Sequence, residues 1–205
     1  MANEIDRVVP PALPLATEQY DRPYMDQNSN VLRLFFNRLT NIVNTLLSTE
    51  DGGRFLYMPR ALFYSTVNQT AAATDTGYPV EFENSYIVNG ISIVSDTRLT
   101  VSAAGMYSFQ VTMQVDHTNS SDATLTTWIN KSGTDVPYGG QIQTLKGNDT
   151  KAVYWNFSID MEPDDYIEMY WATSDTALSL YTEAATALHP GVPSAIVAVS
   201  FVSNL

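Results

Sequence analysis

The stretch GMYSFQVTMQV, residues 105–115, alternates strictly between apolar and polar side chains. Its odd positions from Tyr107 to Val115 are apolar, and every even position from Ser108 to Gln114 is polar and uncharged. Because side chains on a strand point alternately to opposite faces, this period of two predicts a strand with one buried face. The opposite face is polar without carrying charge, which is unusual for a surface in contact with water. The stretch therefore raises the question of what that second face meets.

Around this strand, the chain from residue 61 onward consists of short strand-like segments separated by turn residues such as glycine and asparagine. The segments expected to be strands are 61–68, 78–82, 86–94, 98–102, 106–116, 123–131, 151–161, 165–173, 177–182 and 195–203. Residues 132–149 and 182–194 are expected to be long loops. Because no helical pattern interrupts the series, the sequence predicts an all-β head, an antiparallel sandwich over residues 61–205.

The last segment differs from the others because both of its faces are apolar. Residues 195–202 read AIVAVSFV. In an antiparallel sandwich such a strand is covered once by the partner sheet and once by something else. The simplest second cover is another copy of the same chain.

The first part of the chain predicts an extended arm, residues 1–27, and a neck helix within residues 28–50. Four prolines (Pro10, Pro11, Pro14 and Pro23) oppose helix formation in the arm. Its apolar side chains favour docking in a groove of another chain over a disordered tail. Those arm residues are Val8, Val9, Leu13, Leu15, Tyr20 and Tyr24.

The neck helix carries apolar residues at the alternating spacings of a coiled-coil seam, with Asn28 or Ser29 expected to cap its start. Two alternatives remain open: the helix packs on its own domain, or it forms a short self-associating bundle. The seam residues are Leu32, Phe35, Leu39, Ile42 and Leu46.

The composition narrows the possible partners. The chain has 205 residues, no cysteine and a net charge of −12. Residues 1–60 carry a charge of −1 and residues 61–205 a charge of −11. An acidic head repels phosphate backbones, so nucleic-acid binding is not expected. No apolar run approaches the length that crosses a bilayer, so membrane insertion is not expected either.

Several segments of the head resemble the C1q/TNF-like jelly roll. LTVSAAGMYSF, residues 99–109, is similar to that family's short strand, turn and "G-x-Y-x-F" strand. WINKSG, residues 128–133, EPDDYIEM, residues 162–169, and the closing AIVAVSFV resemble three further family segments, although Asp164 stands where the family usually has glycine.

The resemblance implies a homotrimer in which one sheet of each sandwich faces the threefold axis. The uncharged face of residues 106–114 would then meet its symmetry mates. The residues expected at this trimer interface are Ser108, Gln110, Thr112, Tyr154, Asn156, Val197, Val199 and Phe201.

The first fifty residues also resemble the amino-terminal segment of small tailed-phage structural proteins, through PALPLA at residues 11–16 and VLRLFFNRL at residues 31–39. Together the two resemblances imply a phage virion protein: a homotrimeric knob for capsid decoration, a spike or a fibre. Its arm would dock on other virion proteins of the capsid, portal and neck, or tail. The alternative is a module that binds host-surface glycans or receptors through loops 132–149 and 182–194.

Side chains that could carry chemistry are sparse. His117 and His189 are expected in exposed loops, outside any nucleophile or metal-ligand motif, so catalysis and an organic cofactor are not expected. The one candidate metal site is an acidic turn that suits calcium, with a solvated turn as the alternative. Its carboxylates are Asp160, Glu162, Asp164 and Asp165.

Overall fold

The computed structural model describes residues 12–13, 19, 21–47 and 58–204. The chain divides into two compact units, Met1–Tyr57 and Met58–Leu205. We call the second unit the head.

In the first unit, helix α1 spans Arg22–Leu47 and begins six residues earlier than the sequence predicted. The Asp21 carbonyl accepts the first helical hydrogen bond, from the Met25 N–H at 3.1 Å, so the helix starts there rather than at Asn28 or Ser29. Pro23 lies in the first turn, where its missing N–H would have no helical partner in any case. The prediction of an extended arm up to residue 27 is therefore wrong for its last six residues.

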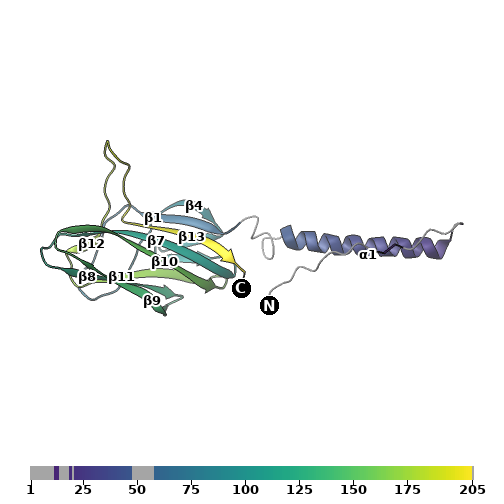
Figure 1. The fold of residues 1–205 in the computed structure, drawn as a ribbon, viewed down its shortest axis with the longest axis horizontal. Helices are drawn as coiled ribbons and strands as arrows, with labels where there is room; N and C mark the ends of the chain where they lie inside the picture. Colours follow the sequence, from purple (N-terminus) through teal and green to yellow (C-terminus); the bar gives the residue numbers. More distant parts are fainter. Residues whose placement is uncertain (1–11, 14–18, 20, 48–57, 205) are drawn as a thin grey trace. The chain divides into compact units, whose positions relative to one another are not determined.

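The head contains two antiparallel sheets (Figure 1). Sheet A consists of β1 (Arg60–Ser65), β2 (Gln69–Thr70), β4 (Asn84–Asn89), β7 (Gly105–His117), β10 (Asp149–Met161), β12 (Leu178–Leu180) and β13 (Ala195–Ser203). Sheet B consists of β3 (Tyr78–Pro79), β5 (Ile91–Val94), β6 (Arg98–Val101), β8 (Ala123–Lys131), β9 (Thr134–Leu145) and β11 (Tyr166–Thr173). The prediction of an all-β antiparallel sandwich with one helix is confirmed.

The order of strands places β7 near the middle of sheet A, between β10 on one side and β13 with β12 on the other. β13 is followed by β1 and then by β4, while β2 pairs with β12. Sheet B runs β5–β6–β11–β8–β9, with β3 beside β11. The chain crosses between the sheets after β2, β3, β4, β6, β7, β9, β10 and β11, so neighbours in sequence repeatedly lie in opposite layers.

The core lies between the two sheets and explains the period of two in β7. Its apolar residues Tyr107 to Val115 point inward, and each is at most 1% exposed. Gly105 starts this strand with a φ of +152°, and a Cβ there would lie 2.3 Å from the Phe201 ring. Only glycine fits that approach, so the first residue of the motif has a packing role.

Two strand predictions need correction. β9 was expected to be part of a loop over residues 132–149, yet it is a twelve-residue strand at the edge of sheet B. The segment 86–94, expected as one strand, is divided at Gly90, which has a φ of +66°. The chain turns there from β4 in sheet A to β5 in sheet B.

Candidate interaction surfaces

The outer face of sheet A, the face turned away from the core, carries an uncharged patch across three adjacent strands. Directly opposite residues in an antiparallel pair point to the same face, so the register defines rows of side chains. Three rows make up what we call the central patch: Ser158–Ser108–Ser200, Asn156–Gln110–Ala198 and Tyr154–Thr112–Ile196.

None of these side chains is charged at neutral pH, although the head as a whole is strongly acidic. Tyr154 is 69% exposed and supplies the largest side chain of the patch. The nearest charge in β10, Asp160, lies one row outside the patch, opposite Met106. The expected interface residues Ser108, Gln110, Thr112, Tyr154 and Asn156 thus lie together on one outward face.

The remaining three expected interface residues lie elsewhere. Val197, Val199 and Phe201 are at most 2% exposed and belong to the core of a single head. Val197 pairs with Val111 and Val199 with Phe109, both of which point inward. Their assignment to a subunit interface is wrong; the outward residues of β13 are Ile196, Ala198, Ser200 and Val202.

Strand β4 adds an apolar edge to the same sheet. Its only partner strand in the described part of the chain is β1. Ile87 is 41% exposed and its neighbour Val88 52% exposed, and adjacent residues of a strand point to opposite faces, so both faces of β4 present apolar side chains. An edge strand of this kind is a site at which other chains can add. The sequence signal was the apolar run YIV at residues 86–88, which lies within the expected strand 86–94.

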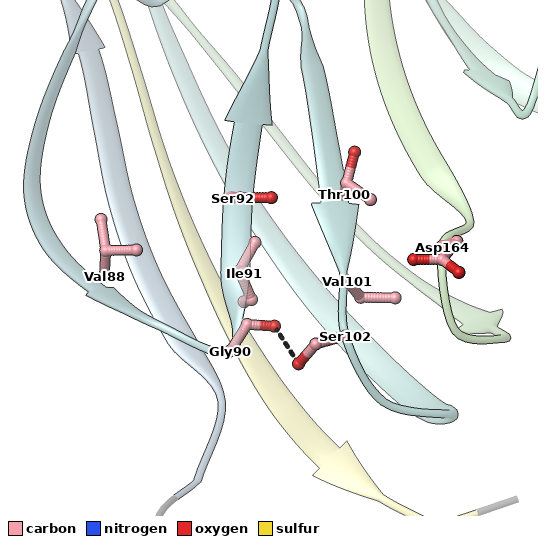
Figure 2. Close-up of a pocket in the computed structure, with 8 residues that line it drawn as sticks. All are labelled: Val88, Gly90, Ile91, Ser92, Thr100, Val101, Ser102 and Asp164. Carbon is pink, nitrogen blue, oxygen red and sulfur yellow. Dashed lines mark hydrogen bonds between the residues drawn. The ribbon is translucent and has the colours of Figure 1, made fainter.

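A cavity of about 340 Å³ lies beside this edge, where β4 turns into β5 (Figure 2). The Ser102 hydroxyl donates to the Gly90 carbonyl at 3.0 Å across its floor. Val88 and Val101 contribute apolar walls, and Asp164 is the one carboxylate in its lining. Its lining thus combines apolar side chains, three hydroxyl groups and a single carboxylate.

The carboxylates of the acidic turn do not gather around one point. Within the described residues, no three His, Asp or Glu side chains gather closely enough to hold an ion. Asp160 and Glu162 are exposed, and Asp164 occupies a turn position with a φ of +69°. The structure therefore does not bring Asp160, Glu162, Asp164 and Asp165 together as the predicted calcium site requires.

Asp165 instead holds the turn together. It accepts hydrogen bonds from the Lys131 ammonium at 2.9 Å, the Ser132 hydroxyl at 3.0 Å and the Glu162 N–H at 2.9 Å. Burial acts to raise the pKa of Asp165, but these hydrogen bonds outweigh it and hold the pKa below its usual value of 3.8.

His117 is fully buried at the end of β7, so its assignment to an exposed loop is wrong. Its Nδ1 lies 3.1 Å from the Lys146 carbonyl and its Nε2 3.3 Å from the Asp175 carboxylate. These contacts join the end of β7 to two neighbouring turns. The Ala177 N–H, then Asn119 and His117, hold the pKa of Asp175 below its usual value of 3.8. His189 lies in the loop 182–194, as expected, with its side chain 35% exposed.

In helix α1 the seam residues Leu32, Phe35, Leu39 and Ile42 are half-buried along one stripe. Leu34 and Phe36 beside them remain 58% and 57% exposed. Leu46 lies in the last turn, but its side chain is outside the described part.

Of the expected docking residues, Leu13 is 50% exposed and Tyr24 lies in α1. Val8, Val9, Leu15 and Tyr20 fall outside the described residues, so the docking arm stays a prediction.

No protein-family model and no curated protein matches this chain. Among the residues that the structure describes, no helix combines the length and apolarity needed to cross a bilayer.

Proposed function

We propose that this chain is a structural protein of a phage virion: a homotrimeric jelly-roll knob held on the particle by its amino-terminal segment. The observation that carries the proposal is the central patch, an uncharged face of nine side chains across three strands on an otherwise acidic head. The virion setting rests on the resemblance of the first fifty residues to phage structural proteins.

The chemistry of the patch favours burial between copies. Interface cores are depleted in charged residues and enriched in tyrosine. Serine, threonine, asparagine and glutamine can be buried if they find hydrogen-bond partners, whereas an unpaired charge cannot be buried without a large cost. Symmetry-related copies of the same patch would supply those partners. Tyr154, 69% exposed at its margin, is suited to anchor the contact.

The strand order supports a jelly roll within the sandwich. Most connections between successive long strands change layer, with β7, β10 and β13 in sheet A and β8, β9 and β11 in sheet B; the exception is the β8–β9 hairpin within sheet B. Such alternation is typical of folds built from Greek keys. In the C1q/TNF-like family that the sequence resembles, one sheet of each copy faces the threefold axis. Here sheet A would take that position.

Helix α1 also supports the association of three copies. Its seam places Leu32, Leu39 and Leu46 at the a positions and Phe35 and Ile42 at the d positions. Leucine at a with isoleucine at d shifts coiled coils from two strands toward three or four. A single helix exposing Leu34 and Phe36 is marginal in water, so association would stabilise it.

A charge placed in the central patch tests the proposal. Gln110 is exposed in the single head, so Gln110→Arg should fold normally but place three cations near the axis. We expect the trimer to weaken by about 3 kcal/mol, roughly a hundredfold, measured by mass photometry over a dilution series. The control is Thr126→Arg on the outer face of sheet B. Equal assembly of both variants would contradict a trimer built on the patch.

A second function, glycan binding at a host surface, is favoured by an aromatic pair on the outer face of sheet B. Trp128 and Tyr170 stack with centroids 5.5 Å apart, and the Trp128 indole donates to the Asp135 carboxylate at 3.1 Å. The side-chain amide oxygen of Asn130 beside them is buried and has no hydrogen-bond partner among the described residues. Such a group of a ring face, an amide and a carboxylate can contact a sugar. A glycan array probed with the full chain and with Asp135→Ala tests this; no binding by the full chain would eliminate it.

A further inference from the structure

The connection from β12 to β13 leaves sheet A through its outer face. Both strands pair with the same edge of β7, β12 at residues 115–117 and β13 at residues 106–113. Between them, the backbone carbonyl of Gln114 accepts from the Tyr181 N–H, and the backbone N–H of Gln114 donates to the Ser194 carbonyl, each at 2.8 Å. On the side of β12 and β13 that faces away from β7, β2 pairs with β12 and β1 pairs with β13. The intervening residues therefore stand away from the sheet, as the hairpin that rises above β1 in Figure 1 shows.

This hairpin, residues 183–192, which we call the finger, is held by its own hydrogen bonds. Glu183 and Val192 exchange two backbone hydrogen bonds of 3.0 and 2.8 Å near its foot. At the tip, the Thr186 N–H donates to the His189 carbonyl at 2.9 Å. The Thr186 hydroxyl accepts from the N–H groups of Leu188 and His189 at 3.2 and 3.3 Å. The finger thus has a fixed shape.

Its tip presents Leu188, which is 92% exposed. The foot lies about five residues away, about 15 Å in extended chain, so this side chain cannot fold back onto its own foot while the tip bonds persist. A large apolar side chain on a rigid projection is suited to insertion into a cavity elsewhere.

Each copy also carries a matching cavity. A pocket of about 320 Å³ lies at the foot of the finger, between the finger and the outer face of β1. Its lining is mostly apolar, with Thr66, Thr182 and Glu183 as the polar members; the other lining residues are Tyr64, Ala184, Gly191, Val192 and Pro193. Apolar cavities of about 150 Å³ hold a benzene ring, so this foot pocket has room for a leucine side chain.

We propose that the finger is an interlocking device between copies of this chain, with Leu188 of each copy seated in the foot pocket of the next. The inference rests on the proposed homotrimer, because the finger and the central patch stand on the same outer face. The occupant is a second copy because the exposed Leu188 suits the volume and the apolar part of the lining of the foot pocket, and because the finger and the central patch share one outer face. Such a head-to-tail contact closes into a ring when the rotation between copies permits it.

Cross-linking tests the proposal cleanly, because the chain contains no cysteine. Leu188→Cys combined with Thr66→Cys in the full chain adds two thiols, one at the tip and one at the foot. With a short bis-maleimide, we expect most of the protein to run as three covalently joined chains on a denaturing gel. The matched control is Leu188→Cys with Thr126→Cys, whose second thiol lies on sheet B and should give at most traces of that product.

The alternative outcomes are distinct. Joined pairs without joined triplets would indicate reciprocal twofold exchange and overturn the ring. A ladder beyond three chains would indicate an open chain and overturn it as well. If no product exceeds the control while the unmodified protein has the mass of a trimer, the finger does not interlock copies and the proposed homotrimer stands. A monomeric mass would overturn both.

Discussion

At the scale of single residues, Asp165 shows how a carboxylate in an acidic turn can be structural. Replacing it by asparagine removes a charge that receives hydrogen bonds from Lys131, Ser132 and Glu162. Because the group is partly exposed, we expect a loss of about 1 kcal/mol in unfolding free energy at neutral pH. Urea denaturation at one protein concentration measures it. The control, Asp164→Asn on the same turn, should change stability by less than about 0.5 kcal/mol.

The pH dependence of this difference has a definite sign. The pKa of Asp165 is lower in the folded state than its usual value of 3.8, so its stabilisation is present above 3.8. It is lost as the pH falls through the lower, folded-state pKa. The difference in unfolding free energy between the parent chain and Asp165→Asn should therefore become smaller in acid. A gap that stays constant down to strongly acidic pH would show that the ionised carboxylate is not the stabilising species.

At the scale of secondary-structure elements, Asn28 is the polar member of an otherwise apolar seam. It precedes Leu32 by four residues and Phe35 by seven, which places it at a d position. Its side-chain carbonyl oxygen is buried with no partner in the described residues. A polar layer of this kind lowers the stability of a coiled coil while fixing its register and number of strands.

We therefore expect Asn28→Leu to stabilise the helical bundle by about 1–3 kcal/mol and to broaden the distribution of oligomers beyond three chains. Circular dichroism melting and light scattering after size exclusion measure the two effects. Asn37→Leu, on the exposed side of the helix, is the matched control. A variant that melts as before and stays uniformly trimeric would remove Asn28 from the seam.

The elements also show what the sequence could and could not predict. The alternation in β7 predicted its buried face because successive side chains of a strand point to opposite faces, and the apolar face is the one that packs on the core. β9 was missed because Gly139 and Gly140 indicate a turn; in the sheet they leave space for Ile129 and Trp128 of β8, which a Cβ would approach within 2.6 and 3.3 Å.

The candidate interface was predicted in part. In β7 and β10 the polar and apolar faces differ, so the outward side chains could be identified from the sequence. In β13 both faces are apolar, and the choice of Val197 and Val199 as outward residues was wrong. Only the register with β7 determines which face points inward. The finger could be expected as a loop, but its emergence from the outer face depends on pairing between strands distant in sequence.

At the scale of the whole molecule, the two units differ in charge, −1 for residues 1–60 and −11 for residues 61–205. Since the head forms a compact unit with its own core, deleting residues 2–50 should leave a folded trimer of heads. The same deletion should abolish incorporation into particles, since three arms would raise a modest affinity through effective concentration. Mass photometry and particle-binding assays measure the two outcomes; monomeric heads, or heads that still bind particles at normal occupancy, would contradict this division.

The central claim is that the outer face of sheet A is covered by copies of the same chain. The most direct measurement is the mass of the full-length protein in solution, by mass photometry or sedimentation at low micromolar concentration. We expect a single species of three times the chain mass of 22.7 kDa. A single species of 22.7 kDa, stable as the concentration rises, would contradict it.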